Sequence, residues 1–109
     1  MPTSINKAFL IGTIGRTGVE VRYTASGSAV ASFLLALAEL WSDGKEHVPL
    51  IPCEVLGKRA EAVAELEPGT PVCVDGKVLR RKLNEKWETV IGCWDLPTIT
   101  VPVTPVEAV

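Results

Sequence analysis

The sequence has few of the residues that build metal centres and redox sites. Its 109 residues include three cysteines and a single histidine, His47. Cys53, Cys73 and Cys93 lie far apart in the sequence, without the close spacing of zinc-ligand pairs, and His47 cannot complete a ligand set alone. Each cysteine has apolar neighbours, so we expect all three to be small core residues, and we expect no metal and no cofactor.

Long apolar runs are also absent. The longest unbroken run, 33–38, is far shorter than the roughly 20 residues that a membrane span needs. The first residues, 1–4, show no basic segment followed by an apolar stretch, so no secretion signal is expected. With 47% hydrophobic and 22% charged residues, the composition is that of a folded domain. We therefore predict one soluble, cytoplasmic domain over 1–109, with no membrane partner.

The chain as a whole lacks an excess of positive charge. Eleven basic and thirteen acidic residues give a net charge of −2, which argues mildly against a nucleic-acid partner. The positive charge is unevenly distributed along the chain. The segment from Lys77 to Trp87 contains five basic residues and one acid, Glu85, which gives a local charge of +4. Salt screens charges beyond about 10 Å, so such a patch can attract a polyanion even on an acidic body. The alternative is an ordinary solvated strand face.

Alternation of apolar and polar residues predicts a chain made mostly of strands. The expected strands cover 5–15, 19–24, 47–56, 71–83 and 87–96, and 98–109 could add one edge strand. Pro49 and Pro52 indicate an edge or irregular strand, because proline cannot donate to a ladder. The segment Ala29–Trp41 has both helical spacing and strand alternation, so periodicity leaves its structure open.

One short helix and one tight turn complete this prediction. Lys58–Glu67 has apolar residues on one face and acids on the other, and Pro68-Gly69 would end the helix. The polar residues Asn84-Glu85-Lys86 join the last two long strands. Because neighbours alternate along a strand, Arg80 and Lys82 should point one way and Arg81 the other.

Five β segments, with one short helix between the third and fourth, have the order of an all-β, five-stranded oligonucleotide-binding (OB) barrel. Several stretches resemble the bacterial single-stranded DNA-binding proteins: the opening strand at Ile5–Gly12, the loop and strand at Gly15-Arg16 and Val21–Gly27, the "FGKxAE" helix start at Leu56–Glu61, and the "KGxxVxVEGxL" segment at Glu67–Val78. The resemblance covers about 5–95, and it implies that Ala29–Trp41 is the second strand. The barrel core would occupy 5–96, with 97–109 as a C-terminal extension.

The resemblance also implies which residues contact DNA. This family stacks bases on aromatic side chains, each base being worth about 1–3 kcal/mol, and binds phosphates in basic grooves. Trp41 falls at a stacking position, and Trp87 lies across the turn from the basic strand, whereas the other stacking positions hold leucines: Leu50, Leu56 and Leu83. The basic residues at or near the DNA path are Lys7, Arg16, Arg22, Lys77, Arg80, Arg81 and Lys82. Each could instead be a solvated surface residue, Trp41 could be a core or interface residue, and Trp94 is expected in the core.

The function that follows is non-specific binding of single-stranded DNA in replication, recombination or repair, in the cytoplasm and at the nucleoid. The alternative is an oligomeric interaction module with weak or lost DNA binding, favoured by the leucines and the acidic balance. We find no nucleophile–base pair, carboxylate dyad or metal set, so an enzyme is not expected. The resemblance implies a homo-oligomer, a tetramer first and a dimer second. The family's acidic tip, which recruits replication proteins, is not expected here.

Overall fold

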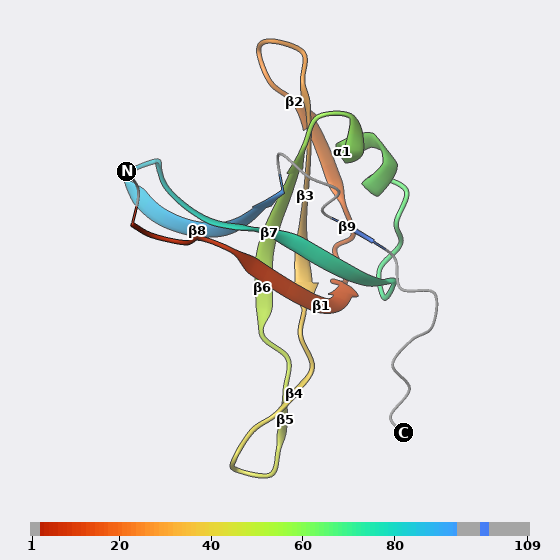
Figure 1. Cartoon of the computed structure of the whole chain (residues 1–109). Helices are drawn as coiled ribbons and strands as arrows, with labels where there is room; N and C mark the ends of the chain where they lie inside the picture. Colours follow the sequence, from red (N-terminus) through yellow and green to blue (C-terminus); the bar gives the residue numbers. More distant parts are fainter. Residues whose placement is uncertain (1–2, 94–98, 101–109) are drawn as a thin grey trace.

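The computed structural model describes residues 3–93 and 99–100, and most of them lie in strands (Figure 1). In chain order the elements are β1 (Ala8–Ile14), β2 (Glu20–Tyr23), β3 (Ala29–Ala36), β4 (Glu39–Leu40), β5 (Glu46–His47), β6 (Leu50–Leu56), α1 (Lys58–Val63), β7 (Pro71–Leu83), β8 (Lys86–Cys93) and β9 (Ile99–Thr100). Trp94 and most of the expected extension 97–109 lie outside the described residues. Within that extension, β9 pairs with β7.

Five strands close into a ring, which confirms the predicted OB architecture. β1 pairs with β3, β3 with β6, β8 with β7 and β7 with β1, all antiparallel. β6 and β8 complete the ring as a parallel pair. The helix α1 lies between β6 and β7, as predicted, but it ends at Val63 and not at Glu67. The helix ends there because the Leu66 N–H donates a hydrogen bond to the Val63 carbonyl, which tightens the chain into a turn.

The ambiguous segment Ala29–Trp41 is a strand where it crosses the core. Phe33 and Leu35 are buried, with 4% and 0% of their surfaces exposed, and they alternate with partly exposed residues. This period of two is the strand pattern, and burial on one face decides between the two readings. The strand ends at Ala36, before Trp41. Beyond the ring the chain continues into a separate hairpin made by β4 and β5, drawn at the bottom of Figure 1, which we call the β4–β5 arm.

Of the two alternatives that the prolines indicated, the third long strand is irregular and is not an edge strand. β6 lies between β3 and β8. Only Cys53–Val55 pair with β8, so Pro52 lies in the half of β6 that has a neighbour on one side alone. Pro49 lies in the gap between β5 and β6, which divides the expected strand 47–56 in two.

Glycines let β1 change partners. β1 pairs with β7 along most of its length and with β3 at Thr13 and Ile14. A Cβ atom at Gly12 would collide with the carbonyl oxygen of Ala36, and one at Gly15 would lie 2.8 Å from the carbonyl oxygen of Leu34. Gly12 and Gly15 are therefore places where the β1 and β3 backbones approach closely.

The core fills the ring with apolar side chains from every long strand, among them Ile14, Leu35, Val55, Val72, Val74 and Ile91. Cys53 and Cys93 belong to it, each with 1% of its surface exposed. The third cysteine, Cys73, is only half-buried. The expectation of core cysteines is thus confirmed for two positions.

Burial of Cys53 predicts a loss of stability at high pH. Desolvation, together with neighbouring Cys93, raises the pKa of the Cys53 thiol from 9.0 to about 12. Above about pH 9 the unfolded chain releases a proton that the folded chain retains. The free energy of unfolding should therefore fall, by up to about 1.4 kcal/mol per pH unit from this group. Urea unfolding at about pH 8 and about pH 10 measures the change. Cys53→Ala should show a smaller fall, and an equal fall would contradict the assignment.

Candidate functional site

The basic segment forms a tightly turned hairpin between β7 and β8. Asn84 and Glu85 both have left-handed backbones, with φ of 51° and 65°, and Leu83 pairs with Lys86. This is a two-residue hairpin loop, one residue shorter than predicted, because Lys86 already belongs to β8. The tight loop fixes the register, so that Arg81 lies opposite Glu88 and Lys82 opposite Trp87.

The two faces of this hairpin differ in chemistry. Arg81 and Glu88 lie on one face and form an ion pair, with 2.6 Å between the Arg81 Nε and the Glu88 Oε1. Arg80, Lys82 and Trp87 lie on the other, which we call the outer face. Here the Arg80 guanidinium lies 5.5 Å from the centre of the Trp87 ring, and Trp87 is 60% exposed. The predicted alternation holds, and the outer face presents two cations and an indole to solvent.

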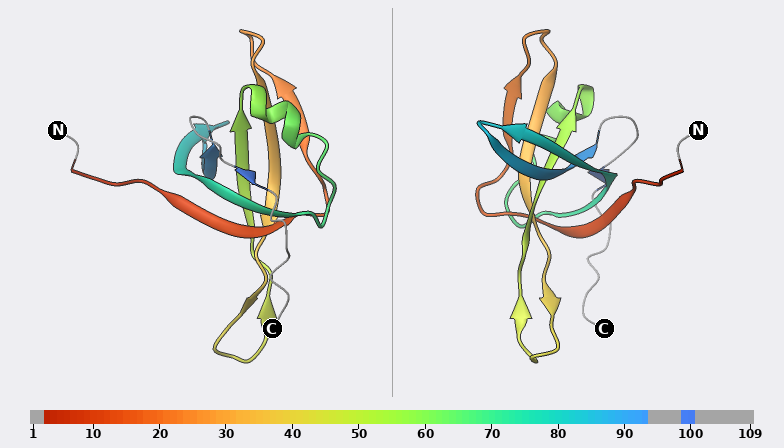
Figure 2. Two further views of the ribbon diagram at one scale, coloured as in Figure 1. Left: turned by 45° about the vertical axis from the view of Figure 1, so that its right-hand side comes forward. Right: turned by 90° about the vertical axis from the view of Figure 1, so that its left-hand side faces the viewer.

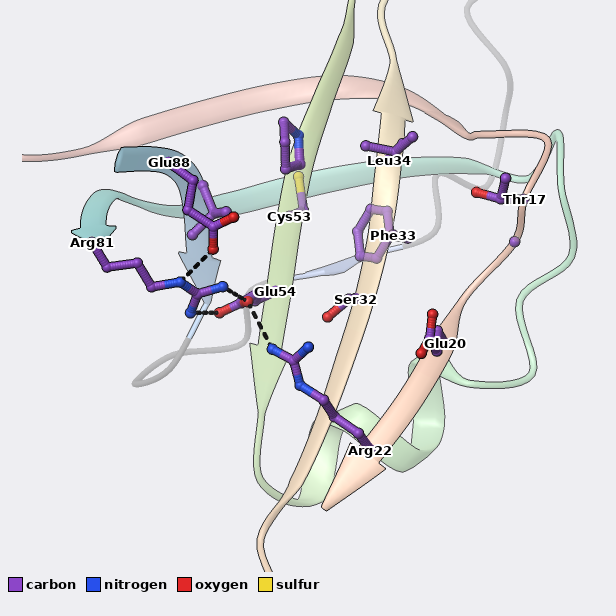
Figure 3. Close-up of a pocket in the computed structure, with 13 residues that line it drawn as sticks. Thr17, Glu20, Arg22, Ser32, Phe33, Leu34, Cys53, Glu54, Arg81 and Glu88 are labelled. Atoms are coloured by element: carbon purple, nitrogen blue, oxygen red, sulfur yellow. Dashed lines mark hydrogen bonds and ion pairs between the residues drawn. The ribbon is translucent and has the colours of Figure 1, made fainter. Parts of the chain in front are cut away.

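A groove of about 300 Å³ lies on the β3–β6 surface beneath the opposite face of the hairpin (Figure 3). We call it the β3–β6 groove. Strands β2, β3, β6, β7 and β8 and the loop after β1 line it, with polar residues Thr17, Glu20, Arg22, Ser32, Glu54, Arg81 and Glu88. OB folds use this sheet face, between two of their loops, to bind ligands. The groove is therefore the place where the fold alone would put a binding site.

Glu54 organises the charges of this groove. Its carboxylate is buried, with 4% of the residue exposed, and Figure 3 shows two arginines directed at it. The Arg81 Nη1 donates to Oε1 at 2.9 Å, and the Arg81 Nη2 donates to Oε2. The Arg22 Nη2 also donates to Oε2, at 3.3 Å. The hydrogen bonds to Glu54 and Glu88 raise the pKa of Arg81 above its ordinary value, so this guanidinium is held as a cation within the cluster.

Trp41 lies on the β4–β5 arm, away from the hairpin of β7 and β8. The arm and that hairpin extend in different directions from the ring (Figures 1 and 2). The Trp41 ring stacks on His47, with 3.8 Å between centroids and 16° between planes, and its Nε1 donates to Glu39 at 3.1 Å. With 50% of its surface exposed, Trp41 is not a core residue of this chain. It is an aromatic surface that is supported by His47 and open to solvent.

Asp43 holds His47 beneath that ring. The His47 Nε2 lies 2.9 Å from the Asp43 Oδ2. The Lys45 backbone N–H and His47 together lower the pKa of the Asp43 carboxyl, the Lys45 contact contributing most. The turn of the arm is thus tied to the histidine that supports Trp41.

The structure distributes the remaining predicted residues over other surfaces. Lys7 precedes β1 and forms an ion pair with Asp75 at 2.8 Å. Arg16 lies exposed in the loop after β1, and Lys77 lies partly exposed in β7, opposite Gly92. Of the leucines at stacking positions, Leu50 is 52% exposed at the base of the arm and Leu56 is partly buried.

Sequence reasoning missed two acids, Glu54 and Glu88, that pair with predicted DNA-binding arginines within the protein. Glu88 lies one residue past the segment Lys77–Trp87, and counting it lowers the local charge to +3. Glu54 lies far from that segment in the sequence, yet it contacts Arg22 and Arg81. The one available signal was that Glu54 is the only charged residue in the apolar stretch 50–56.

Comparisons with known proteins bear on the family and the fold of this chain. The model of the single-strand binding protein family matches residues 5–90. The crystal structure of the wild-type single-stranded DNA-binding protein from Thermus aquaticus is similar, with a TM-score of 0.74 and 23% sequence identity. The match covers 95% of this chain and 44% of that one, so this chain spans less than half of that protein's length. In the part of the chain that the structure describes, no helix is long and apolar enough to cross a membrane.

Proposed function

This chain belongs to the single-strand binding protein family, and from that premise we propose that it binds single-stranded DNA without sequence specificity. The observation that carries the proposal is the outer face of the β7–β8 hairpin. Arg80 and Lys82 supply charge for phosphates, and exposed Trp87 supplies a ring on which a base can stack. Charge and stacking of this kind recognise features that all single strands share.

Trp41 provides a second stacking surface. Its ring is held by His47 and the Glu39 carboxylate, so little conformational freedom is lost when a base stacks on its open side. Since the arm and the hairpin project in different directions, one strand would have to pass along the body of the ring to reach both (Figure 2). Binding should be weaker and more dependent on salt than in aromatic-rich relatives, because charge replaces stacking at the leucine positions.

Single strands are exposed when duplex DNA is opened in replication, recombination and repair, and we place the function there, in the cytoplasm and at the nucleoid. The role is that of a binding protein and not of an enzyme. Titration with oligothymidine tests it. Stacking on Trp41 or Trp87 should quench tryptophan fluorescence, and the affinity should fall as salt increases. An unchanged emission, with no binding measured by anisotropy of a labelled oligonucleotide, would reject the proposal.

A specific observation favours a second candidate, an assembly module with little DNA binding. Three of the predicted DNA-binding cations, Lys7, Arg22 and Arg81, already have carboxylate partners within the chain. Large apolar side chains are also exposed on β1, where Phe9 is 59% and Ile11 53% exposed. The oligothymidine titration separates the two candidates, since an assembly module would self-associate without binding the oligonucleotide.

We propose that the chain forms a homo-oligomer through the exposed face of β1. A tetramer is the favoured state, and a dimer is the alternative. Adjacent exposed apolar residues such as Phe9 and Ile11 are typical of protein interfaces. Light scattering should therefore report a multiple of 11.7 kDa at micromolar concentration. Phe9→Glu should lower the measured mass, whereas Val48→Glu, at a 50% exposed position near the arm, should not. A wild-type mass of one chain would contradict this proposal.

A further inference from the structure

The β3–β6 groove has an acidic floor. Glu20, Ser32 and Glu54 are register partners on β2, β3 and β6, so two carboxylates and a hydroxyl form one row across the sheet. Glu54 is buried in this row, where an unpaired charge would be strongly destabilising. The fold therefore has to supply cations to Glu54 from elements around it.

Those cations are Arg22 and Arg81, and Glu54 uses both of its oxygens to bind them. Glu88 takes the remaining Arg81 contact at its Nε. Among the residues that line the groove, the charged ones are three glutamates and two arginines, a net charge of −1. The groove thus has no surplus positive charge to offer to an anion.

A DNA phosphate entering the groove would compete with contacts that are already made. To bind Arg22 or Arg81 it would have to displace the Glu54 carboxylate, which would then lie buried without its partners. The incoming phosphate would also be repelled by Glu20 and Glu88. On the outer face, Arg80 and Lys82 point away from these carboxylates, so no such competition arises there among the residues that the structure describes.

We propose that Glu54 is an internal competitor of phosphate, which holds Arg22 and Arg81 and directs the DNA backbone away from the groove to the outer face of the hairpin. Glu54 is thus a residue that sets the DNA path and limits affinity. The part of the inference that concerns DNA rests on the proposed function. The competition between Glu54 and phosphate for the two arginines applies to any phosphate.

Glu54→Gln tests the proposal, since it removes the charge at almost constant shape, releases Arg22 and leaves Arg81 with its Glu88 contact alone. Each phosphate neutralised on a single strand steepens the slope of log K against log salt by about 0.7. The variant should therefore gain up to about 1.4 in slope and bind oligothymidine up to about 25-fold more tightly at about 0.1 M salt. Glu20→Gln is the matched control, because it removes an exposed acid from the same groove and should change affinity less than about threefold. Equal binding by wild type and Glu54→Gln, or an equal gain in Glu20→Gln, would overturn the proposal.

Arg22→Ala in the wild-type background provides a test that does not depend on how Glu54→Gln folds, because the Arg22 side chain is 58% exposed. In the wild-type background it should leave oligothymidine affinity within about twofold, since Glu54 already occupies this arginine. In the Glu54→Gln background it should remove about half of the gained slope. A clear loss of affinity in Arg22→Ala alone would show that Arg22 binds DNA in the presence of Glu54, and would overturn the proposal.

Titration with inorganic tripolyphosphate separates failure of this inference from failure of the proposed function. If no variant binds oligothymidine, the proposed function fails, but the competition is still measured. Glu54→Gln should bind tripolyphosphate at least about fivefold more tightly than wild type by calorimetry, and Glu20→Gln should not. Equal binding of tripolyphosphate by wild type and Glu54→Gln would overturn the proposal whatever the oligonucleotide shows.

Discussion

Replacement of both Arg80 and Lys82 by alanine is expected to weaken oligothymidine binding about 25-fold at about 0.1 M salt. Each side chain that neutralises a phosphate on a single strand contributes about 0.7 to the salt slope, so the pair contributes about 1.4. At 0.1 M salt a slope of 1.4 corresponds to a factor of about 25, and the difference should vanish near 1 M. Anisotropy of a labelled oligonucleotide at several salt concentrations measures both quantities.

The control removes the same charge from another surface. Lys58 and Arg59 are exposed at the start of α1, which lies on the other side of the ring from the hairpin in Figure 1. Alanine at both positions should lower affinity less than about threefold, through the change in net charge alone. A loss as large as that of the Arg80 and Lys82 variant would mean that the outer face is not the path of the strand. Reversal of charge at Arg80, Arg81 and Lys82 together, with binding intact, would favour the assembly module.

Trp41→Ala is expected to weaken binding by about 1–3 kcal/mol, or roughly 5- to 150-fold, without changing the salt slope. The loss arises because a base can no longer stack on the open side of the ring, while the phosphate contacts on the outer face remain. Stacking releases few counterions, so affinity should fall by the same factor at every salt concentration. Anisotropy is the suitable measurement, because the substitution itself alters tryptophan fluorescence.

Two further variants define the role of the Trp41 ring. Trp41→Phe keeps an aromatic surface over His47 and should restore most of the lost affinity. Leu40→Ala, at a neighbouring position that is 78% exposed, removes apolar surface from the same arm and should have little effect. If Trp41→Ala lowered the salt slope as the hairpin variant does, the arm would bind phosphates and not bases.

Properties that depend on neighbours in the sequence were predictable without the structure. The opposite directions of Arg80 and Arg81 follow from the alternation of side chains in any strand, and the hairpin contacts confirm them. Cys53 and Cys93, each in a mostly apolar stretch, are buried as expected. The order of strands and helix indicated an OB barrel, but β3, one of the five ring strands, was identified only through the family resemblance.

The segments where local signals compete were less certain. Ala29–Trp41 satisfies both helix and strand periods, and burial between β2 and β6 decides for a strand as far as Ala36. Pro52 indicated an edge or irregular strand, and because β8 pairs with β6 only from Cys53 onward, a ring strand tolerates proline just before that point. In both cases the outcome depends on which strands pair on either side, which local sequence does not encode.

The use of the cations was decided by the tertiary structure alone. The sequence by itself determined a strand-rich domain with a basic hairpin whose side chains alternate between two faces. Only ring closure brings Glu54 of β6 against Arg81 of β7 and Arg22 of β2. A buried carboxylate must acquire partners from whatever elements fold around it, and those partners come from distant parts of the chain. For this reason two neighbouring arginines have different environments. Arg81 is bound by carboxylates within the protein, whereas Arg80 lies at the surface.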